Sequence, residues 1–333
     1  MSLSMRRPWL LCQLCQSRAF STSYRRLAGD SSKDTPKPAT ARATTPSGAL
    51  PPAPKIVAPS PLADAPRPYG KRLEEFTPRP LSRPIGLPYP PQAGQNTGID
   101  SRTLKQRRDD FVNYEKHLEK REYLKNKISR PYFRDWGNMK FHKGKLYVAP
   151  PRLFKPELSL FFPNLYGRTL VRGDKAPRDT TPVLRGRVSV VTVFSSLWAE
   201  NQCGTFVSPQ SNPDVGRLVD DSAGRAQRVS VNIEEDPLKA FLVRLFMGRL
   251  RRAAGSPENH ARYFLVRRGV SDEIREAVGL LNSKVGYTFL LDPDCRIRWA
   301  GSGNSEDHER EGLVKCLRRL LLEDADAAQQ QTT

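Results

Sequence analysis

Few residues in this sequence have the type and spacing needed for chemistry. The cysteines are scattered and odd in number, which is not the pattern of a disulfide framework: Cys12, Cys15, Cys203, Cys295 and Cys316. Cys12 and Cys15 form a Cys-x-x-Cys pair, a spacing found in redox and metal sites, but they lie in a stretch that we expect to be removed. The four histidines show neither a His-Glu-x-x-His motif nor the spacing of a zinc site. We therefore predict no metal site, no cofactor and no catalytic residue.

Cys203 is the one nucleophile that keeps an enzymatic interpretation open. A thiol near the start of a helix is activated where the local field stabilises the thiolate, as in a one-cysteine peroxiredoxin-like oxidoreductase. A lone cysteine is more often a small buried hydrophobic residue. The acidic runs Asp220-Asp221 and Glu234-Glu235-Asp236 are better explained as loop and helix-start residues than as an acid/base pair.

The charge of the chain is strongly positive, with a formal net charge of +20. This balance is compatible with an RNA-binding or ribosomal protein, with a protein at an anionic membrane surface, or with a basic protein of the mitochondrial matrix. No RNA-binding motif accompanies the charge, so no nucleic-acid partner is expected.

The composition of the N-terminal third predicts a targeting sequence and a linker rather than a folded core. Residues 1–29 are rich in Arg and Ser and contain no acidic residue, which is the composition of a mitochondrial presequence. Residues 30–98 are rich in Pro, Ala and Ser without apolar periodicity, which predicts a disordered tether. Nowhere does the chain offer the apolar run of a membrane span, so we expect at most a peripheral membrane contact.

Residues 99–155 predict a charged helix followed by an aromatic strap. Phe111, Tyr114 and Leu118 recur at helical spacing among Arg, Lys and Glu as far as Ser129. That helix is either a solvated one with a weak apolar stripe or a docking helix for a partner or an acidic lipid surface. The aromatic residues after Pro131 then indicate a strap packed on a domain or a partner-binding segment.

Residues 156–325 predict one α/β domain, with a short disordered tail at 326–333. The β-branched run 187–194 indicates a buried central strand, and a helix is expected over 197–207. Further strands are expected at 228–233 and 263–266, a helix capped by Ser271, a hairpin formed by 288–291 and 296–299, and a final helix opened by Ser305. This order predicts a sheet with helices on both faces.

The segment 237–252 is the most suggestive surface element. Its apolar residues form a stripe while its basic residues crowd the remainder, which fits either a core helix or a basic amphipathic helix that contacts a membrane or a client protein. The residues assigned to that membrane or partner contact are Lys239, Phe241, Arg244, Leu245, Arg249 and Arg251.

Two stretches resemble the thioredoxin and peroxiredoxin-like fold: VVTVFSSLWAENQ at 190–202 and TFLLDPDCRIRW at 288–299. In that family the first strand leads to an aromatic residue and then to Cys-x-x-Cys at a helix start. By this resemblance Ala199 and Gln202 occupy the two cysteine positions, and the family's cis-proline position falls near Tyr287. Both hallmarks are replaced, which implies a thioredoxin-like sheet without the thiol chemistry.

A wider resemblance covers about residues 102–322. The stretches that carry it are SRPYFRDWGNMKFHKGKLYVAPPRLFK, FFPNLYGRTL, VVTVFSSLWAENQ and VGYTFLLDPDCRIRWAG. They are similar to the fungal mitochondrial assembly factors for the membrane (Fo) sector of ATP synthase, the ATPase complex subunit ten family. The resemblance implies a non-catalytic chaperone on the matrix side of the inner membrane. Its client would be newly made, mitochondrially encoded subunit a, which it would help to join the proteolipid ring.

Client contacts are assigned by position around the replaced redox site. The candidates are Phe162, Pro163, Asn164, Trp198, Asn201 and Gln202. For Trp198, a role in the core is the open alternative.

Overall fold

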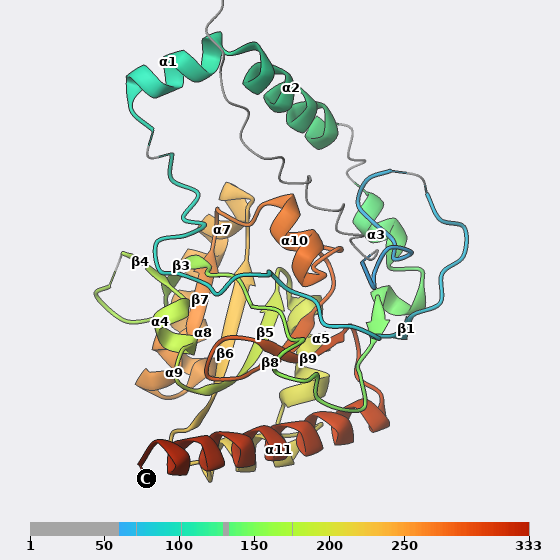
Figure 1. Ribbon diagram of the computed structural model, residues 1–333, viewed down its shortest axis with the longest axis vertical. Coiled ribbons are helices and arrows are strands. Elements are labelled where there is room, and N and C mark those ends of the chain that lie inside the picture. The colour runs from blue at the N-terminus through green and yellow to red at the C-terminus, as the bar shows by residue number, and fades with distance from the viewer. Residues whose placement is uncertain (1–59, 71, 101, 129–132, 175, 333) are drawn as a thin grey trace, which may run out of the picture. The chain divides into compact units, whose positions relative to one another are not determined.

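A computed structural model describes residues 60–70, 72–100, 102–128, 133–174 and 176–332 (Figure 1). The predicted presequence, with Cys12 and Cys15, and the predicted tether as far as residue 59 lie outside these residues.

The described helices, in chain order, are α1 (Leu104–Val112), α2 (Tyr114–Ile128), α3 (Arg134–Asn138), the 3-10 turn η1 (His142–Gly144), α4 (Thr181–Leu184), α5 (Leu197–Val207), α6 (Pro213–Asp220), α7 (Pro237–Leu245), α8 (Met247–Ala254), α9 (Pro257–Ala261), α10 (Asp272–Val278) and α11 (Asp307–Thr332). The described strands are β1 (Arg79–Pro80), β2 (Tyr147–Val148), β3 (Tyr166–Thr169), β4 (Pro177–Asp179), β5 (Val188–Phe194), β6 (Ala226–Ile233), β7 (Tyr263–Val266), β8 (Tyr287–Leu291) and β9 (Ile297–Ser302).

The core is a seven-stranded sheet with the order β4-β3-β7-β6-β5-β8-β9. All seven residues of β5 are buried, so the prediction of a central strand from its β-branched run is confirmed. β5 pairs in parallel with β6 and antiparallel with β8, and β9 closes the hairpin on β8. Strand β5, helix α5, strand β6, the β8–β9 hairpin and the closing helix α11 follow the order of a thioredoxin-like domain, and the predicted fold class is confirmed.

The strands bury both faces because their side chains alternate. Val188 and Val190 point to a core shared with α5, α6 and α11, whereas Val191 and Val193 point to a larger core under α10 and the N-terminal segments. Helices α10 and α11 therefore lie on opposite faces of the sheet (Figure 1).

The prediction of a tether over 30–98 is wrong for the part that the structure describes. Leu62, Ala65, Leu81 and Ile85 are each at most 6% exposed and belong to the larger core. Strand β1 pairs with β2, and the Arg67 guanidinium pairs with a carboxylate on α10. The domain therefore begins well before residue 156, because isolated apolar side chains among the prolines find a sheet face to cover.

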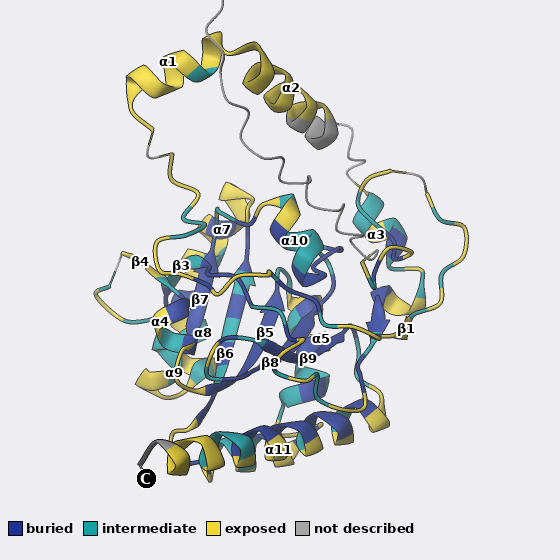
Figure 2. Cartoon of the chain, viewed as in Figure 1, coloured by how far each residue is buried: buried dark blue, intermediate teal, exposed yellow. Residues whose placement is uncertain are grey.

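The predicted charged helix is divided at Asn113 into α1 and α2. The Asn113 side chain accepts hydrogen bonds from the backbone N–H of Glu115 and Lys116, so it caps α2 where α1 ends. Phe111 is 75% and Tyr114 72% exposed, so the apolar stripe is at the surface (Figure 2). The predicted disordered tail is also wrong, because α11 continues to Thr332.

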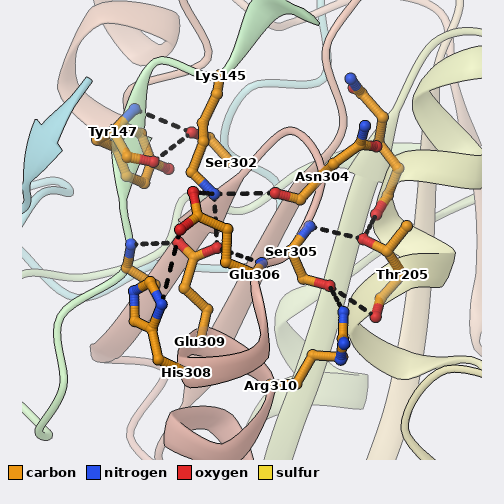
Figure 3. A network of polar contacts seen from close by, with 12 residues as sticks. Lys145, Tyr147, Thr205, Ser302, Asn304, Ser305, Glu306, His308, Glu309 and Arg310 are labelled. Atoms are coloured by element: carbon orange, nitrogen blue, oxygen red, sulfur yellow. Dashed lines mark hydrogen bonds and ion pairs between the residues drawn. The ribbon is translucent and has the colours of Figure 1, made fainter. Parts of the chain in front are cut away.

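A buried ion pair fastens the segment before β2 to α11 (Figure 3). The Lys145 ammonium lies 2.5 Å from the Glu309 carboxylate and donates to the Asn304 carbonyl at 2.9 Å. The other Glu309 oxygen accepts from the Ala149 N–H at 2.7 Å. Every polar atom of this pair is thereby satisfied, as a buried pair requires.

Within the described residues, none of the helices combines the length and the apolar character needed to cross a bilayer.

Candidate functional site

The candidate site begins where β5 passes into α5, the place of the redox motif in a thioredoxin-like domain. Ser196 caps α5, with its hydroxyl accepting a hydrogen bond from the Ala199 N–H at 3.2 Å. Ala199 is fully buried, whereas Leu197 is 72% and Trp198 50% exposed. The start of α5 therefore presents apolar side chains to solvent at the position where redox-active thioredoxin-like domains present thiols.

Gln202 occupies the position of the motif's second cysteine and forms hydrogen bonds within the domain. Its carbonyl oxygen accepts from the Gly286 N–H at 2.9 Å, and its amide nitrogen donates to the Lys143 carbonyl at 3.0 Å. The side chain is 2% exposed. The prediction that Gln202 contacts a client is wrong in this fold. Both ends of its side-chain amide form hydrogen bonds within the domain, one to Gly286 just before β8 and the other to Lys143 in η1.

The Cys203 thiol is buried and lies 3.4 Å from the Tyr287 carbonyl oxygen. Burial raises its pKa to about 12, so the thiol stays protonated at neutral pH. Burial also raises the pKa of Cys295 and Cys316 to about 11 each. All three described thiols therefore have the environment of structural cysteines rather than of nucleophiles.

We predict that Cys203→Ala retains function and that a maleimide leaves Cys203 unlabelled in the native protein. The reason is that the reagent needs an accessible thiolate, which burial denies. Mass spectrometry of the labelled chain, before and after unfolding in urea, identifies the modified residues. Rapid native labelling of Cys203 together with loss of function in Cys203→Ala would instead support the one-cysteine enzyme.

Helix α7 exposes apolar side chains to an unusual degree. Ala240 is its one buried residue, while Leu238, Phe241, Leu242 and Leu245 are between 44% and 66% exposed (Figure 2). The segment expected as one helix over 237–252 breaks at Phe246, which is itself 58% exposed. Of the two interpretations that the sequence left open for this segment, the structure favours the surface helix over the core helix.

A groove of about 460 Å³ lies between α7–α8 and the start of α5. Its accessible surface is mainly apolar, and Glu200, Glu234, Lys239 and Lys284 are the charged residues in its lining. The lining residues used below are Trp136, Leu197, Glu200, Glu234, Leu242 and Phe246. Six separate stretches of the chain line it. One of them, α3, docks beside the loop before β8 through the Asp135 carboxylate, which accepts from the Ser283 N–H at 3.2 Å.

The groove holds two carboxyl groups in a partly desolvated setting. Burial raises the pKa of Glu200, and no described cation opposes this rise. Burial also raises the pKa of Glu234, with Lys239 and Lys284 opposing the shift. Lys284 places its ammonium 5.7 Å from the centre of the Trp136 ring at the groove.

The structure separates the predicted site residues into exposed and buried sets. Trp198 and Asn201 are exposed beside the groove, but Phe162, Pro163 and Asn164 are buried, so these three cannot contact a client at the surface. Asn164 instead donates to the Gln95 carbonyl at 2.7 Å.

The predicted membrane or partner residues are mostly at the surface. Lys239, Phe241, Arg244, Leu245 and Arg249 are exposed. Arg251 is half-buried and donates to the Leu170 carbonyl at 2.6 Å, so it has a structural role.

Sequence reasoning missed Trp136, Glu200, Leu242 and Phe246 as a set that lines one groove. The available signal was the excess of apolar residues over what one helical face can bury in 237–247.

Comparison with protein families identifies a family that most of this chain matches. The family described as ATP10 protein matches residues 67–320. The relative "Mitochondrial ATPase complex subunit ATP10" of Eremothecium gossypii is 31% identical over 250 residues, which cover 75% of this chain and 88% of the relative. The protein of the same name from Saccharomyces cerevisiae is 28% identical over 256 residues, 74% of this chain and 88% of its own.

Solved structures of low sequence identity align with about half of the chain. A thiol:disulfide interchange protein DsbE from Chlorobium tepidum aligns with a TM-score of 0.33 and 13% identity, over 49% of this chain and 96% of its own. Arabidopsis thaliana ScoI with copper bound aligns with a TM-score of 0.28 and 15% identity, over 47% and 97%.

Proposed function

This chain belongs to the ATP10 protein family, and from that premise we propose that it is a non-catalytic assembly factor for the mitochondrial ATPase. In this proposal it acts in the mitochondrion on the membrane sector of the enzyme. It binds newly made subunit a through the groove and promotes its association with the proteolipid ring. The names of its relatives support the ATPase as the target.

One observation carries the client-binding part of the proposal: the apolar groove stands where a redox enzyme of this fold would hold its thiols. Leu242 and Phe246 form its walls while both remain exposed, and the nearest cysteine, Cys203, is buried beneath α5. Contiguous exposed apolar surface of this kind marks interaction sites in soluble proteins. A site that binds an apolar segment without reacting with it is what a chaperone for a membrane subunit needs.

Charge in the groove walls is expected to abolish this activity. We predict that Leu242→Asp or Phe246→Asp weakens client binding by roughly tenfold or more, since buried apolar anchors dominate interface energies. The matched control is Leu322→Asp, at a leucine on α11 that is 58% exposed and does not line the groove. The variants are expressed in cells that lack the protein, and assembled ATPase and subunit a are measured on native gels.

Free catalytic heads and missing subunit a in the groove variants, with normal assembly in Leu322→Asp, support the proposal. Normal assembly in stably folded Leu242→Asp and Phe246→Asp would contradict it.

We also propose a peripheral contact with the matrix face of the inner membrane. Leu238, Phe241 and Leu245 are exposed on α7 but do not line the groove, and Arg244 and Arg249 are exposed beside them. Apolar side chains flanked by arginines are the composition of helices that lie in an anionic membrane interface.

The double variant Arg244→Gln/Arg249→Gln is expected to lower binding to vesicles of phosphatidylcholine and cardiolipin by about thirtyfold, since each cation near an anionic surface contributes about 1 kcal/mol. Flotation of the full chain with such vesicles measures this. The matched control, Arg217→Gln, removes an arginine on α6, outside this helix. Equal flotation of all variants, or equal binding to vesicles without cardiolipin, would rule out this contact.

A further inference from the structure

Glu200 is a charged residue of the groove whose carboxylate has no polar partner among the described residues. Its carboxylate lies one turn into α5 and forms no hydrogen bond or ion pair with any residue that the structure describes. It is partly buried and lines both the groove and an adjacent cavity of about 260 Å³. A desolvated carboxylate without a partner is costly, and such a group is stabilised when a cation reaches it.

Two cations, Lys239 and Lys284, line the groove themselves, and neither forms an ion pair with Glu200 in the described structure. Both lysines oppose the rise in the pKa of Glu234. Lys284 also lies over the Trp136 ring. Arg228 and Arg262 line the adjacent cavity: Arg262 pairs with Glu258 at 3.3 Å, and Arg228 forms no ion pair with Glu200 in the described structure.

Two further polar side chains of the groove, Glu234 and Asn232, also present acceptor oxygens. Glu234 is 9% exposed, and one of its carboxylate oxygens accepts from the Asp236 N–H at 3.2 Å. The Asn232 side-chain oxygen is buried without a hydrogen-bond partner in the described structure, while its amide nitrogen donates to the Tyr263 hydroxyl at 3.1 Å. The groove therefore offers acceptors beside its apolar walls.

We propose that the groove recognises an apolar polypeptide segment that carries one lysine or arginine, with Glu200 as the partner of that cation. This inference rests on the proposed function, because it names the chemistry of the client segment that the groove selects. The walls formed by Leu197, Leu242 and Phe246 bind the apolar side chains, and Glu200 receives the cation. A purely apolar segment leaves this carboxylate unpaired, and a carboxylate placed beside Glu200 is repelled by it.

The test uses the full chain and three dye-labelled peptides, with binding measured by fluorescence polarisation. The peptides share one short sequence of leucine, alanine and serine and differ at the central residue, which is lysine, norleucine or glutamate. Norleucine keeps the length and apolar stem of lysine without its charge. We expect the lysine peptide to bind about tenfold more tightly than the norleucine peptide, as a charge-assisted hydrogen bond provides.

Glu200→Gln is expected to abolish this preference, and the norleucine peptide should bind at least as tightly as it binds the native chain, because no charge is then left unpaired. The matched control is Glu235→Gln, at a nearby glutamate that pairs with Arg275 at 2.8 Å outside the groove, and it should keep the preference. Far-ultraviolet circular dichroism establishes that both variants are folded.

Equal binding of the lysine and norleucine peptides to the native chain overturns the inference while leaving the apolar groove of the proposed function intact. A preference that survives in Glu200→Gln also overturns it. If none of the peptides binds, the client-binding groove itself fails, and with it both proposals.

Discussion

Glu309→Gln is expected to lower the free energy of unfolding by about 3 kcal/mol or more, because it leaves the Lys145 ammonium buried and without its counter-charge. The Lys145 side chain is 6% exposed and that of Glu309 is fully buried. The remaining acidic neighbour, Glu306, is 3.5 Å away and largely exposed, so it compensates little. Urea unfolding followed by circular dichroism gives the difference in free energy.

The same helix supplies a matched control for this prediction. Lys315 and Glu311 form an exposed pair on α11 at 3.4 Å, and Glu311→Gln should cost less than about 0.5 kcal/mol. The double variant Lys145→Met/Glu309→Gln removes both buried charges and should be more stable than Glu309→Gln alone. Equal effects of Glu309→Gln and Glu311→Gln would show that the buried pair contributes no more than a surface pair.

Gly286→Ala is expected to destabilise the domain by about 2 kcal/mol or more, because α5 packs directly against this residue. A Cβ atom there would lie 2.2 Å from the Ala199 carbonyl oxygen and 2.8 Å from the Cys203 sulfur. The Gly286 N–H is bonded to Gln202 and its carbonyl accepts from the Gly303 N–H at 2.9 Å, so the backbone is held on both sides. Either α5 or β8 must move, and such overpacking costs about 1–3 kcal/mol or more.

Gly204→Ala on α5 is the control, with the opposite expected sign. A Cβ atom at Gly204 meets no atom within 4 Å, and alanine is favoured over glycine in a helix by about 0.5–1 kcal/mol. Thermal unfolding should show Gly286→Ala melting about 4–8 °C below the native chain, and Gly204→Ala slightly above it. A melting temperature unchanged in Gly286→Ala would mean that α5 is not packed against β8 as described.

The parts of the fold that could be predicted from the sequence are those fixed by local patterns. The β-branched run of β5 needs two buried faces, and the Ser271 hydroxyl accepts from the Ile274 N–H at the start of α10, as expected of a cap. The parts that could not be predicted depend on distant contacts. Leu62 and Ile85 lie among prolines without periodicity, and their burial follows from the sheet face that they cover.

The position of the candidate site could be predicted from the sequence, but the residues that form it could not. Resemblance placed Gln202 at the replaced redox position, yet residue type alone does not reveal that its amide is bonded to Gly286 rather than facing a client. The seven large apolar residues of 238–247 fitted either a core helix or a surface helix. Only their packing in the structure shows that most of them are exposed. The groove joins α3, α5 and the continuous stretch from β6 to α8, and these three parts are far apart in the sequence.

The central claim is that the groove binds newly made subunit a, and site-specific photocrosslinking in mitochondria tests it most directly. A photoreactive amino acid is placed at Leu242 in the groove or at Leu322 on α11, and both positions are well exposed. Mitochondrial translation products are then radiolabelled before irradiation. The account predicts that the Leu242 probe captures newly made subunit a and that the Leu322 probe does not. Capture of no translation product at Leu242, or equal capture of subunit a at both positions, would contradict it.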